Sequence, residues 1–257
     1  RSTLFPYTTL FRSSIVPCEH VYTISYDKKK LHSRLYRNKD SNRVVIMFHG
    51  YRGTARRDFS GACMHMIKKG YNVLLVDQRG HGDSKGHSTT FGSKEKRDVL
   101  SWISFAKKEF GENIDLVLVG ISMGAASILF AAKDIKGPVK LICDCPFSTI
   151  KEVLCSFMEK LKLPIWITWN STKLSSLLFC HASLTKDDAS KSLKNSDCKA
   201  LIIHGDKDTI VNYKFSYRVY LENKEKVRYE LFPNTEHGVS YMTDTNRYIR
   251  VIDEFLE

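Results

Sequence analysis

The stretch Ile114–Lys133, IDLVLVGISMGAASILFAAK, joins two segments of different pattern at a serine. Residues 114–119 form a short apolar run rich in β-branched side chains, which predicts a buried strand. Residues 123–133 are mostly small and apolar and predict a helix that packs closely against its neighbours. Between them, Gly120-Ile-Ser-Met-Gly124 places Ser122 on a tight turn, where the flanking glycines let neighbouring backbone pass close by. The sequence therefore predicts a strand–turn–helix unit that projects the Ser122 hydroxyl from the edge of a sheet.

The rest of the chain continues this alternation of strands and helices. A hairpin is expected first, with strands at Val21–Ser25 and Leu31–Tyr36. Strands buried on both faces and followed by helices predict an α/β fold, with a mostly parallel central sheet and helices on both of its faces. Further strands are expected at Val44–Phe48, Val73–Val76, Val139–Cys143, Ala200–His204 and Val227–Phe232, and helices at Ala55–Lys69, Glu95–Phe110, Asn212–Tyr220 and Tyr248–Leu256.

One long segment, from Pro146 to Asp197, interrupts the alternation with helical periodicity and no obvious strand. A loop of that length without secondary structure would be unusual inside a compact domain. We therefore expect a helical cap, or lid, over residues 147–197, inserted into a core formed by residues 14–146 and 198–257. Its apolar cluster contains three candidates for a substrate pocket, and the alternative is that the cluster only packs the insertion onto the core. These candidates are Ile165, Trp166 and Trp169.

A serine hydroxyl is a weak nucleophile unless a neighbouring base accepts its proton. His237 follows the last expected strand, in Thr235-Glu-His-Gly238, and is the predicted general base. His204 ends a strand and is better placed as a structural residue. His181 lies in the cap segment and has no obvious partner. This chemistry requires Ser122 and His237 to meet at the same edge of the sheet.

The acid that orients the base is expected between the nucleophile and the base in the sequence. The loop His204-Gly-Asp-Lys-Asp208 supplies two candidates, Asp206 and Asp208. Asp208 is preferred because the apolar segment after it can pack and fix the loop. Asp206 is the alternative, and it is also placed to make turn hydrogen bonds.

Two backbone amides are expected to bind the negative charge that develops on the substrate oxygen. The amide of Met123, directly after Ser122, is one predicted donor. The other is expected in the loop after the first buried strand of the alternation, which begins His49-Gly50-Tyr51. Gly50 allows the backbone to turn, so Tyr51 is the predicted second donor.

Five short motifs occur in the order typical of the α/β-hydrolase superfamily, which the chain resembles from Val21 to Glu257. It looks most similar to bacterial cytoplasmic carboxylesterases and serine-aminopeptidase-like hydrolases. The resemblance implies that Arg79 and His81 support the active-site region from the second of these motifs. The histidine loop departs from the family pattern, a Gly-x-Gly-His-like loop, because Thr235-Glu-His237 lacks the glycines. The motifs are His49-Gly50, Asp77-x-Arg-Gly-His-Gly-x-Ser84, Gly120-x-Ser-x-Gly124, His204-Gly-x-x-Asp208 and Glu236-His-Gly238.

Composition bounds the remaining possibilities. The 257 residues suit one domain, and no apolar run approaches the roughly 18 residues that a membrane span requires. Seven scattered cysteines suit reduced thiols, and no secretory signal peptide is visible, so a cytoplasmic protein without a structural metal is expected. The segment Arg1–Ser13 resembles translated sequencing-adapter sequence and is expected to be a non-native or disordered head outside the fold.

The net charge of +12 raises the possibility of a nucleic-acid or anionic-membrane partner. The basic residues are spread along the whole chain, and no nucleic-acid-binding motif accompanies them. A generally basic surface is therefore expected, with no nucleic-acid partner and no stable insertion into a membrane. The oligomeric state stays open.

These observations predict a serine hydrolase that cleaves carboxylic esters with short or aromatic acyl groups, through a Ser-His-Asp triad and an acyl-enzyme. No cofactor is expected, and the partner is a small-molecule ester. A peptidase is an alternative if Asp187 or Asp188 of the cap can hold a substrate amino terminus. A thioesterase is possible too, and so is a monoacylglycerol lipase, which an exposed Trp166–Trp169 cluster would favour. A non-catalytic binding protein of the same fold is the remaining alternative.

Overall fold

The computed structural model describes residues 16–257. The expectation for Arg1–Ser13 lies outside these residues. Within them, eight strands form one sheet in the order β1-β2-β4-β3-β5-β6-β7-β8. The sheet is antiparallel at β1-β2 and β2-β4 and parallel from β4 to β8, which confirms the predicted α/β-hydrolase fold. The strands are β1 (Glu19–Ile24), β2 (Lys30–Tyr36), β3 (Arg43–Phe48), β4 (Asn72–Asp77), β5 (Asp115–Ile121), β6 (Lys140–Asp144), β7 (Lys199–Gly205) and β8 (Val227–Phe232).

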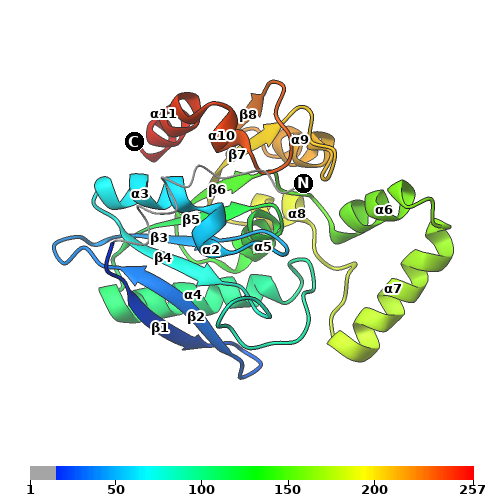
Figure 1. Ribbon diagram of the computed structural model, residues 1–257, viewed down its shortest axis with the longest axis horizontal. Coiled ribbons are helices and arrows are strands. Elements are labelled where there is room, and N and C mark those ends of the chain that lie inside the picture. The colour runs from blue at the N-terminus through cyan, green and yellow to red at the C-terminus, as the bar shows by residue number, and fades with distance from the viewer. Residues whose placement is uncertain (1–15) are drawn as a thin grey trace.

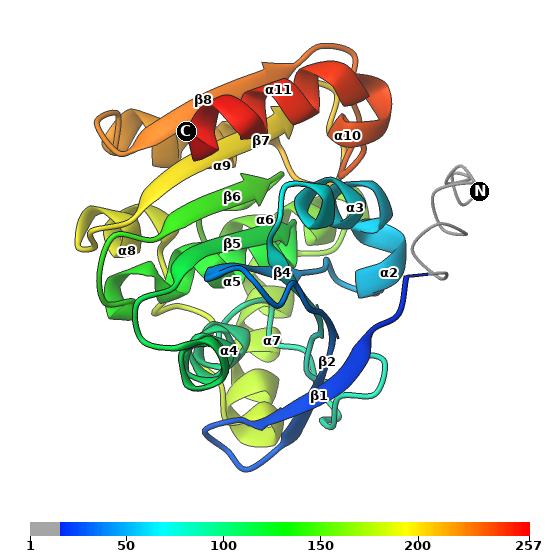
Figure 2. The same ribbon diagram turned by 90° about the vertical axis from the view of Figure 1, so that its left-hand side faces the viewer.

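Helices cover both faces of the sheet, as Figures 1 and 2 show. One core cluster packs α4, α5, α8 and α9 against the sheet, and a second packs α2, α3 and α11 against the opposite face. The helices are α2 (Ala55–Asp58), α3 (Ser60–Lys68), α4 (Glu95–Phe110), α5 (Met123–Ala131), the 3₁₀ turn η1 (Ala132–Asp134), α6 (Ile150–Lys160), α7 (Ile165–Cys180), α8 (Ala189–Lys194), α9 (Tyr213–Glu222), α10 (Ser240–Thr243) and α11 (Thr245–Leu256).

The continuous apolar runs of the central strands follow from these two cores. In β3, the side chains of Val44 and Ile46 enter the first cluster, whereas those of Val45 and Met47 enter the second. Successive side chains of a strand point to opposite faces, so a strand covered on both sides must be apolar throughout. The parallel sheet is thereby held between two helical layers.

The helix expected over Ala55–Lys69 is divided into α2 and α3 at Phe59. Phe59 has φ −116° and ψ 13°, outside the helical region, and its side chain is buried in the second core cluster. The helix is thus interrupted where the Phe59 ring is buried in the core. The local sequence pattern does not reveal this tertiary contact. The closing helix α11 begins at Thr245, earlier than expected, where the Asp244 side chain accepts a hydrogen bond of 2.9 Å from the Arg247 amide.

The helices α6 and α7 stand away from the sheet and contact each other (Figure 1). We call residues 150–180, which comprise these two helices and their turn, the arm. By contrast, α8 packs against α5 and α9. The part of the expected insertion that projects from the body is therefore shorter than residues 147–197. None of the helices within residues 16–257 combines the length and apolar character needed to cross a bilayer.

Candidate active site

Ser122 lies between the end of β5 and the start of α5, with φ 54° and ψ −114°. A non-glycine residue rarely adopts a positive φ, and such strain is characteristic of functional turns. The Ser122 amide is held by a hydrogen bond of 2.8 Å to the Asp144 carbonyl oxygen. A Cβ atom at Gly120 would meet the backbone of Ala125, and one at Gly124 would meet the Phe48 carbonyl. The two glycines thus allow the close approach that the turn requires.

His237 lies in the loop after β8, and both of its ring nitrogens have partners. Its Nε2 is 2.9 Å from the Ser122 Oγ, and its Nδ1 is 2.6 Å from Asp208 Oδ2. A carboxylate can only accept at Nδ1, so the proton belongs on that nitrogen and Nε2 is left to accept the serine proton. The three residues predicted from the sequence therefore form one continuous chain of hydrogen bonds.

The Asp208 carboxylate is buried, and both of its oxygens accept hydrogen bonds. Oδ1 accepts from the amides of Ile210 and Val211 at 2.8 Å each, while Oδ2 faces both His237 and His204. Burial acts to raise the pKa of Asp208, but the hydrogen bonds from His204 and His237 outweigh it and hold this pKa well below its usual range. Asp208 is therefore a carboxylate at neutral pH.

His204, expected only as a structural residue, contacts the carboxylate of Asp208 directly. It is fully buried, with Nε2 3.1 Å from Asp208 Oδ2 and Nδ1 2.7 Å from the Ser216 Oγ. Asp206, the alternative acid, accepts a hydrogen bond of 3.3 Å from the Thr235 amide. Asp206 thus holds the loop that carries His237 and does not contact its imidazole. The sequence signal for the His204 contact is its spacing of four residues from Asp208 at the end of β7.

In the loop after β3, as the structure describes it, several amides are engaged, but that of Tyr51 is not. The Gly50 amide donates to Asp58 Oδ2, the Arg52 amide to the Nε2 of His81 at 3.2 Å, and the Gly53 amide to the Gly50 carbonyl. Within residues 16–257, the Tyr51 amide has no hydrogen-bond acceptor. The side chain of Tyr51 is turned outward and packs against the Phe91 ring at a centroid distance of 5.1 Å.

Met123 is the first residue of α5. The first amides of a helix have no acceptor within the helix, and they form the positive end of its dipole. The Met123 amide is therefore available beside the Ser122 hydroxyl, where negative charge is best accommodated.

Comparison with known proteins places the chain in a family. The sequence profile of the family described as serine aminopeptidase, S33, matches residues 39–195, which is more than half of the chain. The chain belongs to this family. It is therefore a hydrolase of the α/β-hydrolase superfamily, as the order of its motifs predicted.

The relatives of this S33-family hydrolase include an uncharacterised protein of Bacillus subtilis, YqkD. The two are 26% identical over 236 residues, which cover 90% of this chain and 76% of YqkD. A lysophosphatidylserine lipase of zebrafish (Danio rerio), ABHD12, is 26% identical over 190 residues. That match covers 71% of this chain and 47% of the lipase, so the chain spans about half of that relative's length.

Solved structures of esterases share the fold of this S33-family hydrolase. The esterase Pf2001 of Pyrococcus furiosus aligns with a TM-score of 0.74 and 25% identity, over 99% of this chain and 96% of the esterase. The esterase EaEST of Exiguobacterium antarcticum aligns with a TM-score of 0.67 and 20% identity, over 93% and 99% of the two chains.

In this S33-family hydrolase, the loop after β4 braces the loop that carries Tyr51. The buried guanidinium of Arg79 forms a two-pronged ion pair with Asp98, at 2.5 and 2.6 Å, and also reaches Asp27 at 3.1 Å. His81 has its Nδ1 3.0 Å from the Arg79 carbonyl, and its Nε2 accepts from the Arg52 amide. Arg79 thus anchors one loop, and His81 joins that loop to the next.

Cys145 is a neighbour of the site that the sequence did not reveal. Its Sγ lies 3.9 Å from His237 Nε2, on the side of the imidazole that faces Ser122. Burial raises the pKa of the Cys145 thiol well above its usual value. The sulfur is therefore a neutral thiol at physiological pH and a poor nucleophile compared with a thiolate.

Two groups of side chains within residues 16–257 bring three possible metal-ligand atoms within 4.8 Å of one another. One group, Cys145, Asp208 and His237, overlaps the site just described. Both ring nitrogens of His237 are already engaged there, so a metal ion would have to displace its contact with Ser122. The other group consists of His20, His32 and Asp83.

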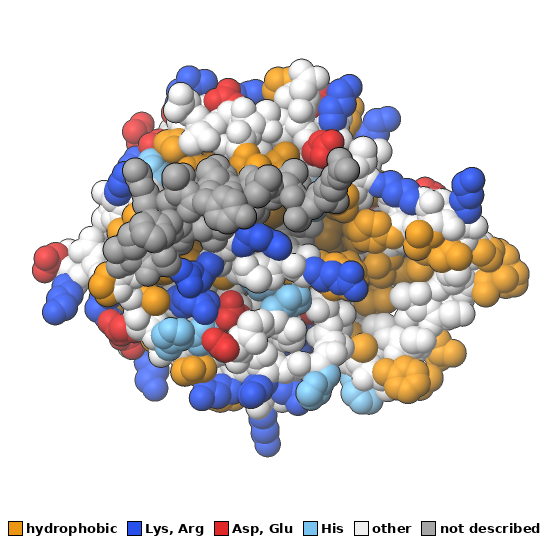
Figure 3. Space-filling model, in the orientation of Figure 1, with side chains coloured by type: hydrophobic (Ala, Val, Ile, Leu, Met, Phe, Trp, Pro, Cys, Tyr) orange, Lys and Arg blue, Asp and Glu red, His pale blue; other side chains and the backbone are white. Residues whose placement is uncertain are grey.

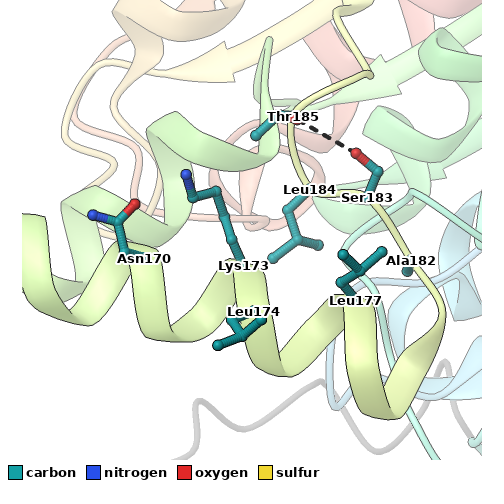
Figure 4. A pocket seen from close by; sticks show the side chains of 8 residues that line it. All are labelled: Asn170, Lys173, Leu174, Leu177, Ala182, Ser183, Leu184 and Thr185. Atoms are coloured by element: carbon teal, nitrogen blue, oxygen red, sulfur yellow. Dashed lines mark hydrogen bonds between the residues drawn. The ribbon is translucent and has the colours of Figure 1, made fainter.

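The three pocket candidates of the arm do not form one cluster. Trp169 is buried in the first core cluster and Ile165 packs against that cluster, whereas Trp166 is 73% exposed. Residues four apart share a helix face, so the side of α7 that carries Ile165 and Trp169 meets the core and Trp166 points elsewhere. A cavity of about 340 Å³ lies between α7 and residues 182–185, lined in part by Leu177 and Leu184 (Figure 4). None of the three candidates is among its lining residues.

Proposed function

We propose that this hydrolase cleaves carboxylic esters through an acyl-serine intermediate, with Ser122 as nucleophile, His237 as general base and Asp208 as the group that orients His237. The observation that carries the proposal is the chain of hydrogen bonds from the Ser122 Oγ through both imidazole nitrogens to the buried carboxylate. This is the arrangement needed to activate a serine hydroxyl near neutral pH.

The proposed reaction has two halves. The Ser122 Oγ attacks the ester carbonyl carbon while His237 Nε2 accepts the hydroxyl proton, and Asp208 stabilises the resulting imidazolium. His237 then returns this proton to the leaving alkoxide, which departs as an alcohol and leaves an acyl-serine. Water, deprotonated by His237, attacks the acyl carbon and releases the carboxylic acid. The Ser122 oxygen takes the proton back.

The amides of Tyr51 and Met123 are proposed to bind the carbonyl oxygen as it becomes negative. The free Tyr51 amide and the position of Met123 at the start of α5 support this assignment. Backbone donors of this kind stabilise a transition state by about 3 kcal/mol each. Because backbone amides supply the stabilisation, no cofactor is required in this mechanism.

An ester is preferred to a peptide as substrate because the acidic candidates of residues 147–197 are already paired. The Asp187 carboxylate is buried and lies 2.5 Å from Lys96 Nζ. The Asp188 side chain accepts from the Lys191 amide at 3.1 Å and lies 3.9 Å from Arg218. Neither carboxylate is therefore free to hold the amino terminus of a peptide.

A lipid ester is a second candidate, and the exposure of Trp166 favours it. An apolar side chain that is 73% exposed on the arm is consistent with long acyl chains or their aggregates near the site. The similarity to the esterase Pf2001 supports the first candidate, a simple ester. The similarity to the lysophosphatidylserine lipase ABHD12 supports the second, a lipid ester. A non-catalytic binding protein is disfavoured, since such proteins have no need of a complete triad.

The test is hydrolysis of p-nitrophenyl acetate, butyrate, octanoate and palmitate by the wild type, Ser122→Ala and a control, Ser101→Ala. The control serine lies on α4 and bonds only its own helix at the Arg97 carbonyl. We expect Ser122→Ala to lower kcat by at least about 10⁴-fold, and Ser101→Ala to retain the wild-type rate. Turnover by Ser122→Ala close to that of the wild type would contradict the proposed nucleophile. Preference for acetate and butyrate would favour a small pocket, and preference for octanoate or palmitate a lipid ester.

A further inference from the structure

For its length, the arm exposes far more large apolar side chains than the body of the molecule does. Sixteen large apolar side chains are exposed within residues 16–257, and half of them lie between residues 161 and 179. Figure 3 shows apolar side chains along the arm, on the right of that view. An apolar concentration of this kind on one segment indicates a surface that is covered by something else in use. The side chains are Leu161, Leu163, Trp166, Ile167, Leu174, Leu177, Leu178 and Phe179, and they are between 42% and 82% exposed.

Packing on the body does not account for these side chains. Only one side of α7, the side with Trp169, reaches the core. Leu174, Leu177 and Leu178 lie three and four residues apart, and more than half of each side chain is exposed. A helix with this much apolar surface normally lies inside a protein or in contact with lipid. With 16 residues, α7 is about 24 Å long and too short to cross a bilayer, so it can lie on a membrane surface but cannot span one.

The charged residues around these apolar side chains indicate what kind of partner covers the arm. Residues 160–186 contain four lysines and no aspartate or glutamate. Three of them, Lys160, Lys162 and Lys186, are exposed. Lysines beside exposed tryptophan, phenylalanine and leucine are the composition of helices that bind anionic lipid surfaces. A second copy of this chain would bring like charges together, since each copy carries a net charge of +12.

We propose that the arm binds the surface of an anionic lipid bilayer. Trp166 and Phe179 enter the boundary between headgroups and acyl chains, and the neighbouring lysines contact the anionic headgroups. This inference goes beyond the proposed ester hydrolysis and does not depend on it, because binding to lipid requires no turnover.

Tryptophan fluorescence provides a direct test, because the chain has three tryptophans and only one of them is exposed. Trp102 and Trp169 are 0% and 7% exposed, whereas Trp166 is 73% exposed. Vesicles of phosphatidylcholine with phosphatidylglycerol should shift the emission to shorter wavelength, since Trp166 leaves water. Vesicles of phosphatidylcholine alone should cause a much smaller shift, and added salt should weaken the response to the anionic vesicles.

Variants locate the contact. The double variant Leu161→Ser/Phe179→Ser should lower cosedimentation with the anionic vesicles by at least about tenfold, because two exposed apolar side chains of the arm are lost. Ile24→Ser is the matched control, since Ile24 is 60% exposed on β1 of the body, and it should bind like the wild type. All three proteins should hydrolyse a water-soluble ester at equal rates if they hydrolyse it at all.

Two outcomes would overturn the proposal. One is an emission spectrum that neither kind of vesicle changes. The other is an emission shift that appears without lipid as the protein concentration rises, together with a doubled mass by light scattering, which would show that a second copy covers the arm. Ser122→Ala should bind vesicles as the wild type does, so failure of the proposed hydrolysis would leave this result unaffected.

Discussion

At the scale of single residues, the site depends on how each charged group is partnered. Asp208 and Asp206 lie two residues apart on one loop, yet only Asp208 reaches the imidazole of His237. Asp208 is buried, and both of its oxygens have hydrogen-bond partners. Asp206 accepts a hydrogen bond from the Thr235 amide and so holds the loop. We therefore expect the two carboxylates to have separable effects, one on the proposed chemistry and one on the loop.

Amide substitution of each aspartate tests this separation. Asp208→Asn should lower kcat by about 10⁴-fold, because an amide cannot hold the Nδ1 proton of His237 and stabilise the imidazolium. Asp206→Asn keeps an oxygen that can accept from the Thr235 amide, so its kcat should stay close to that of the wild type. Steady-state kinetics with one ester decides the matter. A large loss in Asp206→Asn and none in Asp208→Asn would exchange the roles of the two residues.

Asp144 shows how a buried carboxyl can make stability depend on pH. Its side chain is buried, and its Oδ1 accepts a hydrogen bond of 3.2 Å from the Ser240 hydroxyl. Burial raises the pKa of Asp144 to about 6, with the neighbouring His204 acting in the opposite direction. The folded state therefore binds this proton more tightly than the unfolded state, in which the pKa is about 4.

The free energy of unfolding of the wild type should therefore fall, relative to Asp144→Asn, as the pH rises from about 4 to about 6. A difference of two pKa units corresponds to a loss of about 3 kcal/mol, fully present above pH 6. Asp144→Asn removes the titrating group and should lack this part of the pH dependence. Urea unfolding at pH 4 and pH 8 measures the difference, with the exposed Asp197→Asn as control. Parallel pH profiles for the wild type and Asp144→Asn would contradict the expectation.

At the scale of elements, the loop after β4 positions the loop after β3. His81 is the link between them, since its Nε2 accepts from the Arg52 amide, next to the Tyr51 amide proposed to bind the oxyanion. The Arg79–Asp98 ion pair fixes the other end of the same loop against α4. His81 thus holds the backbone beside the amide that is proposed to bind the oxyanion.

His81→Ala should lower kcat by about tenfold to a hundredfold and change KM little, because a displaced oxyanion donor weakens binding of the transition state. The control is His87→Ala, an exposed histidine a few residues further along the chain. Circular dichroism should show both variants folded. Equal kinetics for His81→Ala and the wild type would mean that the Tyr51 amide keeps its place without this link.

Prediction from the sequence worked best for elements with a distinct local pattern. The amphipathic helix Glu95–Phe110 has the predicted bounds, and the central strands were recognisable because they are apolar on both faces. The break at Phe59 and the packing of α8 on α5 escaped prediction, since both depend on tertiary contacts. The sides of α7 could not be told apart, because apolar residues occur all around that helix.

The three residues of the proposed triad were placed by motif order and by their positions after strands. Their neighbours His204 and Cys145 were not, although both lie against them. The His204 contact has only its spacing of four residues from Asp208 as a signal, and the Cys145 contact joins the end of β6 to the loop after β8, which no local spacing describes. A motif names the residues that belong to it but not the contacts that they make, and Cys145 belongs to no motif at all.

At the scale of the whole molecule, the body and the arm differ in how they are held. The body is packed from both faces of the sheet, whereas the arm adds only four buried side chains to the first core cluster: Ile150, Val153, Met158 and Trp169. Segments with few buried contacts open at a lower free energy than the core does. The turn between the two arm helices is therefore the place where the described chain is easiest to open.

Limited trypsin digestion should locate this opening. Lys160 and Lys162 are exposed at the end of α6 and in the turn that follows it. Among sites within residues 16–257, the first cut should fall after one of these two lysines, as identified by mass spectrometry. The control is the exposed turn at residues 28–30, which β1 and β2 hold on either side. A first cut there would contradict the expected order of stability.

The positions of Ser122, Asp208 and His237 after β5, β7 and β8 also determine when during folding the three side chains can meet. These strands are paired through β6 and across long stretches of sequence, so no short fragment of the chain can bring the three side chains together. Parallel sheets of this kind assemble slowly, because distant segments must meet before their contacts form. On the ribosome, Ser122 emerges more than a hundred residues before His237. Under the proposed mechanism, a nascent chain therefore carries an inert serine until the sheet is finished and the three side chains meet.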